Sequence, residues 1–452
     1  MKKIRTLYFL LILVLATSAP SLSQDVPASV APVPGPQAPS QFIPFSVPTS
    51  TMPSLRGSQS PFLSLSATLD RSLIQSPRMS GVRALLGVAK AGYAQALVLP
   101  NPGIYIANNY RNSYLTGASI PVEPPWKLCF RLLIAKRQVE QTKLEIARAM
   151  WQFRGEVRKA YAAFVTSDEL LKARLQVRDL SQKIWDASKT QYEQGSVPGL
   201  DVRRAKLAWI QARMDADAAQ IQMNQAREQL DLIMGSSPDE PIKTPPLELG
   251  GQGSELLPDQ SKELPNRAQL VATARENRLE LKIAKAAILT NEANLKNAYG
   301  NVIPTPRFVT GRVIESNPPT GPKTKEPFFQ AYIDTPVLNF NQGDITKFKA
   351  LEKQLKLDLG GQNNQVEGQV SLAYHRVIAA RQRLKTFTEE AIPEANAVGD
   401  ISKHGYELGQ LDLNTLLDAQ RANIQTKSQF FDAVLAYQLA LNDLEQAIGV
   451  PL

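Results

Sequence analysis

Small and apolar residues recur between positions 202 and 233 at alternating spacings of three and four. They are Val202, Ala205, Trp209, Ala212, Ala216, Ala219, Met223, Ala226, Leu230 and Ile233. This heptad-like spacing predicts a long helix that packs along its length against another helix. The positions found 214 residues later continue the pattern in phase. They are Leu416, Ala419, Asn423, Thr426, Phe430, Ala433, Tyr437, Ala440, Leu444 and Ala447.

The same offset relates the segments that flank these helices. Tyr192 to Gly195 recurs as Tyr406 to Gly409, and Gly235 recurs as Gly449, each 214 positions later. A constant offset across two helices and their turns predicts an internally duplicated chain. We expect the first structural repeat at 63–235, a proline- and glycine-rich linker at 236–265, and the second repeat at 266–450.

Each repeat has the same predicted order of elements. In the first, a helix over 63–99 precedes a β-hairpin at about 103–122. A helical hairpin at about 126–235 follows, with its turn at Gly195–Gly199. Its first helix runs without an internal proline for about 70 residues, or on the order of 100 Å, a length typical of coiled-coil arms.

The second repeat restates the plan with a helix over 267–301, a β-hairpin at about 307–337 and a helical hairpin at about 343–449. Pro393 is expected to bend its first long helix. In the last predicted strand, Phe329, Ala331 and Ile333 alternate with polar neighbours. One apolar and one polar face are what a barrel with a lipid-facing outside and a wet lumen requires. The fold class is therefore mainly α with a small β part.

The N-terminus carries an export signal. The apolar run Leu7–Leu15 follows Lys2, Lys3 and Arg5, which predicts a signal peptide over 1–23. Residues 24–62 are proline-rich and predict an extended lead-in. A mean hydropathy of −0.22 excludes a bundle of membrane-spanning helices.

Catalytic chemistry has little support in the sequence. The chain has one cysteine, Cys129, which we expect to be half-buried, and two distant histidines, His375 and His404, so no metal-ligand spacing exists. No phosphate-binding loop or catalytic triad is found, and we predict neither an enzyme nor a cofactor. The net charge of +9 comes from basic residues interleaved with acids. This predicts solvated helix faces rather than a nucleic-acid partner.

Acidic residues mark the two helical turns. Asp201 starts the returning helix of the first hairpin, and Asp412 and Asp418 flank the start of the second. Helix capping and compensation of the helix dipole are the simplest roles for Asp201 and Asp412. Asp418 lies deeper in its helix, where capping explains it less well.

Together these motifs resemble the TolC family of outer-membrane efflux channels. The resemblance rests on Tyr-x-x-Gly, a turn, the helix containing Leu416–Gln420 and a final apolar–Gly pair, and it spans residues 63 to 450 in both repeats. Pro336–Asp344 and Ile120–Glu123, with Lys127 and Arg131, resemble the heavy-metal and cation efflux branch.

The resemblance implies a homotrimer in which each chain gives four strands to one transmembrane β-barrel in outer-membrane lipid. Its helices would extend into the periplasm and meet an adaptor protein linked to an inner-membrane pump. Gate residues would be Asp201, Tyr406, Asp412 and Asp418. The adaptor-docking tips would be Gly195, Ser196, Val197, Gly409, Gln410 and Leu411. The sequence does not distinguish among three classes of transported substrate: a metal cation, a drug and a secreted protein. The alternative is a periplasmic coiled-coil scaffold without a barrel.

Overall fold

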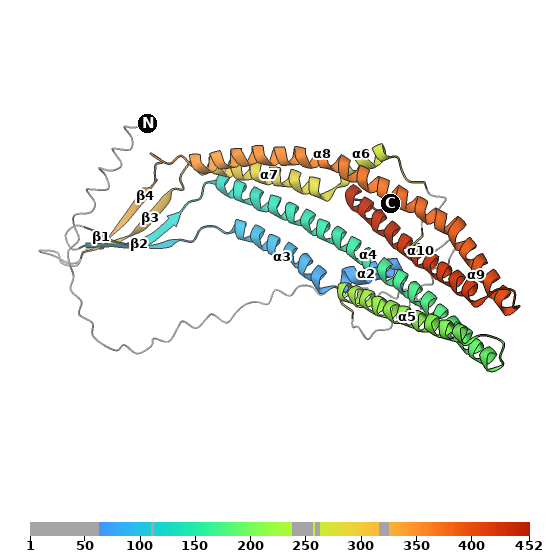
Figure 1. The fold of residues 1–452 in the computed structure, drawn as a ribbon. Helices are drawn as coiled ribbons and strands as arrows, with labels where there is room; N and C mark the ends of the chain where they lie inside the picture. The colour runs from blue at the N-terminus through green and yellow to red at the C-terminus, as the bar shows by residue number, and fades with distance from the viewer. Residues whose placement is uncertain (1–62, 110–112, 237–255, 258–262, 316–324) are drawn as a thin grey trace, which may run out of the picture. The chain divides into compact units, whose positions relative to one another are not determined.

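The computed structural model describes residues 63–109, 113–236, 256–257, 263–315 and 325–452 (Figure 1). All of these belong to one structural unit, Ser60–Leu452. The predicted signal peptide, the proline-rich segment and most of the linker lie outside the described residues.

The α-helices are α2 (Leu65–Gln75), α3 (Pro77–Leu97), α4 (Pro125–Glu193), α5 (Gly199–Met234), α6 (Arg267–Asn277), α7 (Leu279–Gly300), α8 (Gln342–Thr386), α9 (Ile392–Glu407) and α10 (Leu413–Ile448). The strands are β1 (Gly103–Asn109), β2 (Ser113–Pro121), β3 (Arg307–Glu315) and β4 (Lys325–Tyr332). The prediction of a mainly helical chain with a small sheet is confirmed.

The longest helix, α4, has 69 residues and packs along α5. Six residues of the predicted stripe on α5 are buried: Ala205, Ala212, Ala216, Ala219, Ala226 and Leu230. Alanine at these positions lets two helix backbones approach closely, which explains why a helix with little apolar bulk packs along its whole length. We call this set the inner stripe of α5.

Two predicted single helices are wrong in detail, because each is interrupted. The first breaks at Ser76, since a residue before proline is kept out of the helical region and Pro77 follows. The second breaks at Arg278, whose ψ of 123° is extended. Each break packs against a glycine that ends a long helix: Ser76–Pro77 against Gly235 at the end of α5, and Arg278 against Gly449 at the end of α10. A Cβ on Gly235 would lie 2.9 Å from Pro77 Cδ, and one on Gly449 would lie 3.0 Å from Arg278 Cα.

The predicted bend near Pro393 takes the form of a π-helix, η1 (Phe387–Ala391), between α8 and α9. Proline has no backbone N–H to donate to the preceding turn, and the turn before Pro393 has the wider π-helical geometry instead of the α-helical one. The helix therefore continues to Glu407, where the second turn begins.

The four strands form one antiparallel sheet in the order β1-β2-β3-β4, so both hairpins join side by side and β1 and β4 are its edges. The last strand ends at Tyr332, which corrects the prediction that it includes Ile333. In the middle of the sheet Gly117 is paired with Gly311. A Cβ on either glycine would lie 2.1 Å from a carbonyl oxygen of the opposite strand.

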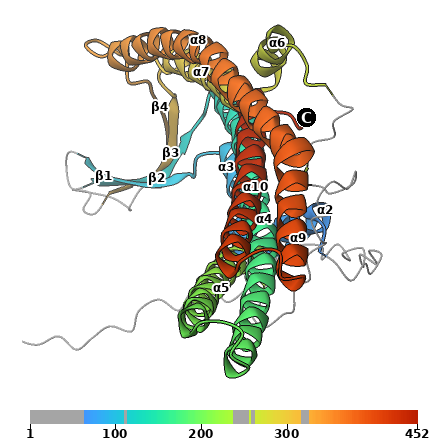
Figure 2. The ribbon, with the colours of Figure 1, turned by 45° about the vertical axis from the view of Figure 1, so that its right-hand side comes forward.

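Long helices separate the sheet from the two helical turns (Figures 1 and 2). Near the sheet, α3, α4, α7 and α8 pack successively against one another, and towards the turns the succession is α5, α4, α10 and α9. The main hydrophobic core lies where these groups meet and draws on α4, α5, α6, α8 and α10.

A buried ion pair crosses this core. Arg158 Nη1 on α4 lies 2.7 Å from Glu445 Oε2 on α10. The Nε of Arg158 also donates to Gln438 Oε1, and Gln438 in turn donates to the carbonyl oxygen of Leu256 at 2.6 Å. The described part of the linker is thereby attached to both halves of the chain.

Candidate functional site

No catalytic centre is evident in the described residues. They contain no group of three or more His, Cys, Asp or Glu side chains placed to hold a metal ion. His375 and His404 are exposed on α8 and α9. Cys129 is exposed on α4, contrary to the predicted half-burial. None of the described helices combines the length and apolarity that a membrane span needs.

The two helical turns have the same backbone design. Gly195 and Gly409 have φ values of 74° and 71°, in the left-handed region that favours glycine. The N–H of Ser196 donates to Gln191 O at 2.9 Å, and that of Gln410 donates to Gly405 O at 2.8 Å. These bonds close the ends of α4 and α9 and reverse the chain within a few residues.

A polar network joins the two turns and contains two of the predicted gate acids. The Nη1 of Arg204 lies 3.7 Å from Asp201 Oδ1 on the same helix and donates to Asn414 Oδ1 of α10 at 3.4 Å. Asn414 Nδ2 then donates to Asp412 Oδ2 at 3.2 Å. Asp201 and Asp412, from different halves of the chain, are therefore linked through two side chains. The i,i+3 spacing of Asp201 and Arg204 could be read from the sequence, but the contact with Asn414 could not.

Asp412 also caps α10. Its Oδ1 accepts the backbone N–H of Thr415 at 3.1 Å and the Thr415 hydroxyl. The hydrogen bond from that hydroxyl is the largest cause that lowers the pKa of Asp412 below its usual value of 3.8, followed by the backbone bond. The capping role predicted for Asp412 is thus present. For Asp201 it is not, because α5 begins at Gly199 after Pro198, and Asp201 lies inside its first turn.

The other two gate candidates lie apart from this network. Asp418 is exposed and pairs with Arg421 at 3.5 Å on its own helix. Tyr406 is half-buried against a small apolar cluster in which Ile184, Ala205 and Leu416 bring α4, α5 and α10 together.

The residues predicted to dock an adaptor lie at the two turns, where few other side chains surround them. A Cβ added to Gly195 or to Gly409 would meet no other atom within 4 Å. Ser196 and Gln410 are exposed, and Val197 and Leu411 are half-buried. A Cβ on Gly405 would lie 2.7 Å from Leu411 Cδ1, so Leu411 folds back over the end of α9.

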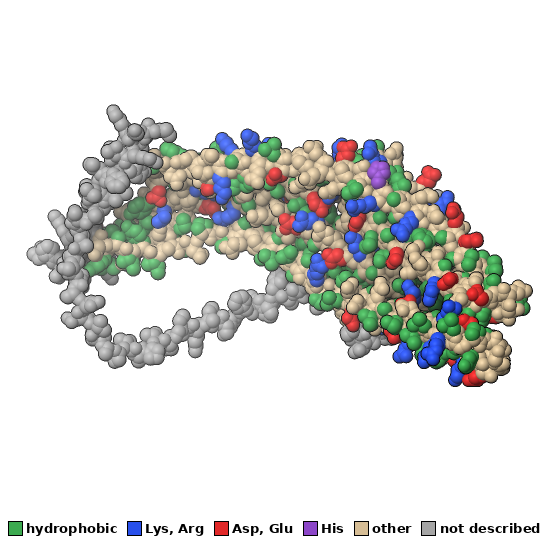
Figure 3. Space-filling model, viewed as in Figure 1, with side chains coloured by type: hydrophobic (Ala, Val, Ile, Leu, Met, Phe, Trp, Pro, Cys, Tyr) green, Lys and Arg blue, Asp and Glu red, His purple; other side chains and the backbone are tan. Residues whose placement is uncertain are grey.

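The sheet has one face with exposed apolar side chains. Strand alternation and the pairing register place Ile104, Ile106, Ile120 and Phe329 on this face, and all four are exposed. Ile104 is 88% exposed. On the opposite face Val309 is buried, and Tyr105, Leu115 and Val313 are half-buried. Figure 3 shows hydrophobic side chains gathered over the strands.

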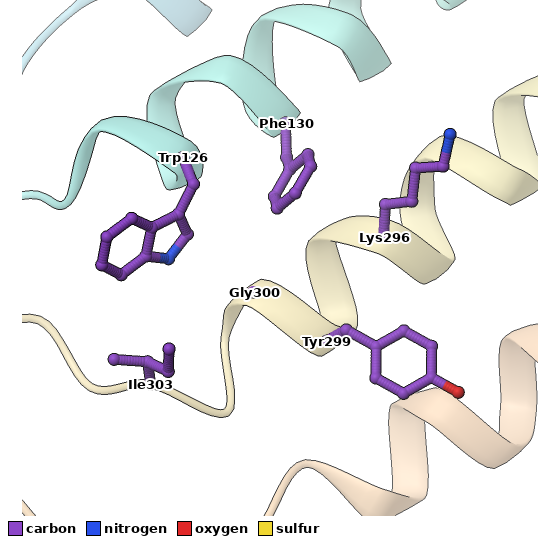
Figure 4. A pocket seen from close by; sticks show the side chains of 6 residues that line it. All are labelled: Trp126, Phe130, Lys296, Tyr299, Gly300 and Ile303. Atoms are coloured by element: carbon purple, nitrogen blue, oxygen red, sulfur yellow. The ribbon is translucent and has the colours of Figure 1, made fainter.

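An apolar groove lies where the helices leave the sheet (Figure 4). Trp126 and Phe130 of α4 face Tyr299, Gly300 and Ile303 at the end of α7 across about 400 Å³, with Lys296 at its rim. Its lining holds no carboxylate, histidine or cysteine, and its titratable side chains are Lys296 and Tyr299.

The sequence matches a known family. Residues 68–236 match the model of the outer membrane efflux protein family. The chain is also 20% identical over 411 residues to the cobalt-zinc-cadmium resistance protein CzcC of Cupriavidus metallidurans, with 86% of this chain and 90% of CzcC covered.

Solved structures have the same fold. CusC, described in conformations that accompany folding and transmembrane channel formation, matches with a TM-score of 0.66 and 16% identity over 88% of this chain and 96% of CusC. The CmeC outer membrane channel of Campylobacter jejuni matches with a TM-score of 0.65 and 12% identity over 85% of each chain. Residues 68–236 therefore match the outer membrane efflux protein family, and the described chain has the same fold as CusC and the CmeC outer membrane channel.

Proposed function

We propose that this chain is the outer-membrane duct of a tripartite efflux system. Three copies would each give four strands to one closed barrel. The observation that carries the proposal is the four-stranded sheet, which has an exposed apolar face and two unpaired edges and leads into long helical hairpins. An unpaired strand edge cannot face hydrocarbon, because its N–H and C=O groups have no partner there. Closure with further copies satisfies both edges.

The proposed architecture includes an internal duplication, which two observations support. Within the described residues, the glycines with positive φ are Gly195, Gly235, Gly409 and Gly449, which form two pairs 214 positions apart. Both α5 and α10 have 36 residues. Two equivalent hairpins per chain let a ring of copies build a tubular wall from one kind of element. The domain boundaries at 63–235 and 266–450 are part of this proposal, as is export by the signal peptide.

The partners follow from the proposed place in the cell. The helical turns would reach into the periplasm and dock an adaptor through Gly195–Val197 and Gly409–Leu411, and the adaptor would connect the duct to an inner-membrane pump. Similarity to a cobalt-zinc-cadmium resistance protein favours divalent metal cations among the possible cargoes.

Purification from outer membranes in detergent, followed by insertion into planar bilayers, tests the proposal. We expect a particle of three copies that conducts ions. A water-soluble monomer without membrane association contradicts the duct and supports the alternative periplasmic scaffold.

The gate is a second part of the proposal. Copies arranged around an axis would bring their Asp201, Tyr406 and Asp418 side chains towards a common entrance, where rings of acids favour cations. We expect Asp418→Ala with Tyr406→Phe to raise the conductance of the isolated channel several-fold. The matched control is Asp358→Asn with Tyr374→Phe on α8, an acid and a tyrosine remote from the turns. Equal conductance of both double variants would contradict the gate assignment.

A further inference from the structure

The groove between α4 and α7 has an apolar end near the sheet and a cationic end away from it (Figure 4). Helix α4 runs away from the sheet and α7 runs towards it. Trp126 and Ile303 are therefore nearest the strands, and Lys296 lies about two helical turns farther away. Trp126 is 40% exposed and Ile303 is 53% exposed, so neither is covered by its own chain. Lys296 is the charged side chain of the lining, which makes the groove amphipathic along its length.

Gly300 forms the floor of the groove. A Cβ on Gly300 would lie 2.9 Å from two ring carbons of Phe130 and 3.5 Å from Cδ1 of Trp126. The missing side chain therefore lets both aromatic rings approach α7. A methylene group takes up about as much volume as a water molecule in the liquid, about 30 Å³. The groove, at about 400 Å³, thus has room for on the order of a dozen methylene groups, the size of an acyl chain.

The strand register shows which side of the helices continues the exposed apolar face of the sheet. The N–H of Val122 donates to the carbonyl oxygen of Pro306 at 2.9 Å, so the strand pairing continues one residue beyond β2. Strand alternation then places Val122, which is exposed, on the same face as Ile120. Glu123 lies on the opposite face, where its Oε1 is 2.9 Å from Arg131 Nη1.

A polar cavity of about 520 Å³ occupies that opposite side, between α3, α4 and α7. Glu123 lines it together with Lys127 and Arg131. Trp126 and Phe130 each precede one of these two basic residues by one position, so they point about 100° away from them around α4. The apolar groove and the polar cavity therefore open on different sides of α4, and the groove lies on the side of the exposed apolar face.

The groove lies within the helical layer of one copy and not at its edge. Near the sheet, α3, α4, α7 and α8 pack successively, which makes α4 and α7 the two middle helices. In the proposed assembly, neighbouring copies would meet the edge helices. The groove would then stay open to the surroundings of the duct, which argues against a second copy as its occupant.

Basic side chains are concentrated at this end of the molecule. The helical segments nearest the sheet, residues 125–137, 293–300 and 342–349, contain seven basic residues and one acid. Around the two helical turns, residues 180–214 and 387–418 contain seven basic residues and ten acids.

Two ammonium groups at the groove lack a counterion. The Nζ of Lys349 on α8 lies 5.7 Å from the ring centroid of Tyr299, which lines the groove. Neither Lys349 nor Lys296 forms an ion pair with a residue that the structure describes. Unpaired ammonium groups beside an apolar groove suit the phosphate of an anionic lipid.

We propose that this groove binds one anionic phospholipid of the membrane leaflet that faces the helices. An acyl chain would lie against Trp126, Phe130 and Ile303, and the headgroup phosphate would contact Lys296, with Lys349 beside it. This orientation agrees with the leaflet, whose chains point towards the sheet and whose headgroups point towards the helices. The inference rests on the proposed outer-membrane duct and adds a specific lipid site at the base of its barrel.

Fluorescence quenching by lipids with brominated acyl chains tests the site. In the full chain with Trp151→Phe, Trp185→Phe and Trp209→Phe, Trp126 is the remaining tryptophan. In detergent, we expect brominated phosphatidylglycerol to quench Trp126 at about five-fold lower concentration than phosphatidylcholine with the same chains, the effect of about one basic side chain at an anionic lipid surface. Adding Lys296→Gln should remove this preference. Equal quenching by the two lipids before that substitution would overturn the inference.

Matched variants on α7 separate the groove from its surroundings. Lys285→Gln removes the same charge about three turns farther from the sheet and should leave the preference unchanged. Ile303→Gln should weaken quenching by both lipids several-fold, whereas Leu289→Gln, at another exposed apolar residue, should not. If Lys285→Gln reduces the preference as much as Lys296→Gln, the charge of the whole helix and not this groove attracts the lipid, and the inference is wrong.

A soluble phosphate is the alternative ligand of the same chemistry. Millimolar glycerol 3-phosphate should not restore the fluorescence that the brominated lipid has quenched. If it does, the site takes a free phosphate and the lipid assignment is wrong. Native mass spectrometry of the protein with all its tryptophans gives a second measurement. We expect Lys296→Gln to retain about five-fold less phosphatidylglycerol than the unsubstituted chain, and equal retention would overturn the inference.

The outcomes also separate this inference from the proposed function. Copy number and conductance of the unsubstituted protein report on the duct alone. A conducting trimer without a lipid preference leaves the duct standing and shows that the lipid site is wrong. A water-soluble monomer that does not conduct contradicts the duct whatever the result with lipid.

Discussion

At the residue scale, the acids at the two turns show how the start of a helix decides the role of an acid near it. Asp412 precedes α10, and its carboxylate is free to accept the N–H of Thr415. Asp201 lies in the first turn of α5 because Pro198 and Gly199 start that helix earlier. Its carboxylate therefore pairs with the guanidinium of Arg204, which in turn donates a hydrogen bond to Asn414. The sequence predicted capping and dipole compensation for both acids. Asp412 is the cap, whereas Asp201, in the first turn of α5, is placed to compensate the helix dipole, because that helix starts earlier, after Pro198.

The pKa of Asp412 gives a pH-dependent prediction. Because the folded state lowers this pKa below 3.8, the carboxylate stabilises the fold above the unfolded pKa, and the effect is lost as pH falls through the folded pKa. We expect Asp412→Asn to lower the Tm at neutral pH by on the order of 1 °C, with the difference from wild type vanishing as the pH falls through the lowered pKa of Asp412. Thermal unfolding of detergent-solubilised protein, followed by helical circular dichroism, measures this. Asp418→Asn, at a residue that caps no helix, is the control, and an equal, pH-independent effect in both variants would contradict the assignment.

At the scale of elements, heptad spacing was sufficient to predict the long helices. The inner stripe of α5 is buried because its alanines fit against α4. Spacing alone did not locate the helix breaks at Ser76 and Arg278. Pro77 marks the first of them in the sequence, whereas the second has no adjacent proline and packs against Gly449, more than 150 residues away. The exposure of Leu200 and Leu207 was also missed, because both fall between the positions of the inner stripe, and the sequence does not show which face of α5 the helix α4 covers.

The glycine pair in the sheet gives a prediction for the strands. Replacing Gly117 or Gly311 with alanine places a Cβ 2.1 Å from a carbonyl oxygen, so the strands must separate. We expect a loss of about 1–3 kcal/mol of stability for each substitution, on the scale of overpacking. Heat-dependent migration of the folded protein on gels measures the loss. Gly87→Ala in α3, where an added Cβ meets nothing within 4 Å, should be neutral or stabilising. Similar losses in all three variants would show that the close approach of the strands is unimportant.

At the scale of the whole molecule, the chain leaves apolar side chains exposed on one face of the sheet and along α5, where Leu200, Leu207 and Met214 are exposed. Exposed apolar surface favours association with lipid or with other copies. In the proposed assembly, lipid would cover the exposed face of the sheet. Closure of the barrel would pair the free edges of β1 and β4 with neighbouring copies, so membrane insertion and association of the copies would support one another.

Adjacent residues of β4 test the lipid-facing surface. Phe329 lies on the exposed apolar face and Gln330 on the opposite face. If the proposed barrel exists, Phe329→Lys places a charge in hydrocarbon, which costs about 2–4 kcal/mol near the middle of the bilayer. We expect it to reduce the amount of folded trimer in outer-membrane fractions. Gln330→Lys adds the same charge to the lumen, so the trimer should assemble normally and become less selective for cations in bilayer recordings. If Phe329→Lys assembles normally while Gln330→Lys does not, the two faces are assigned the wrong way round. If both assemble and neither alters selectivity, the sheet does not line a channel.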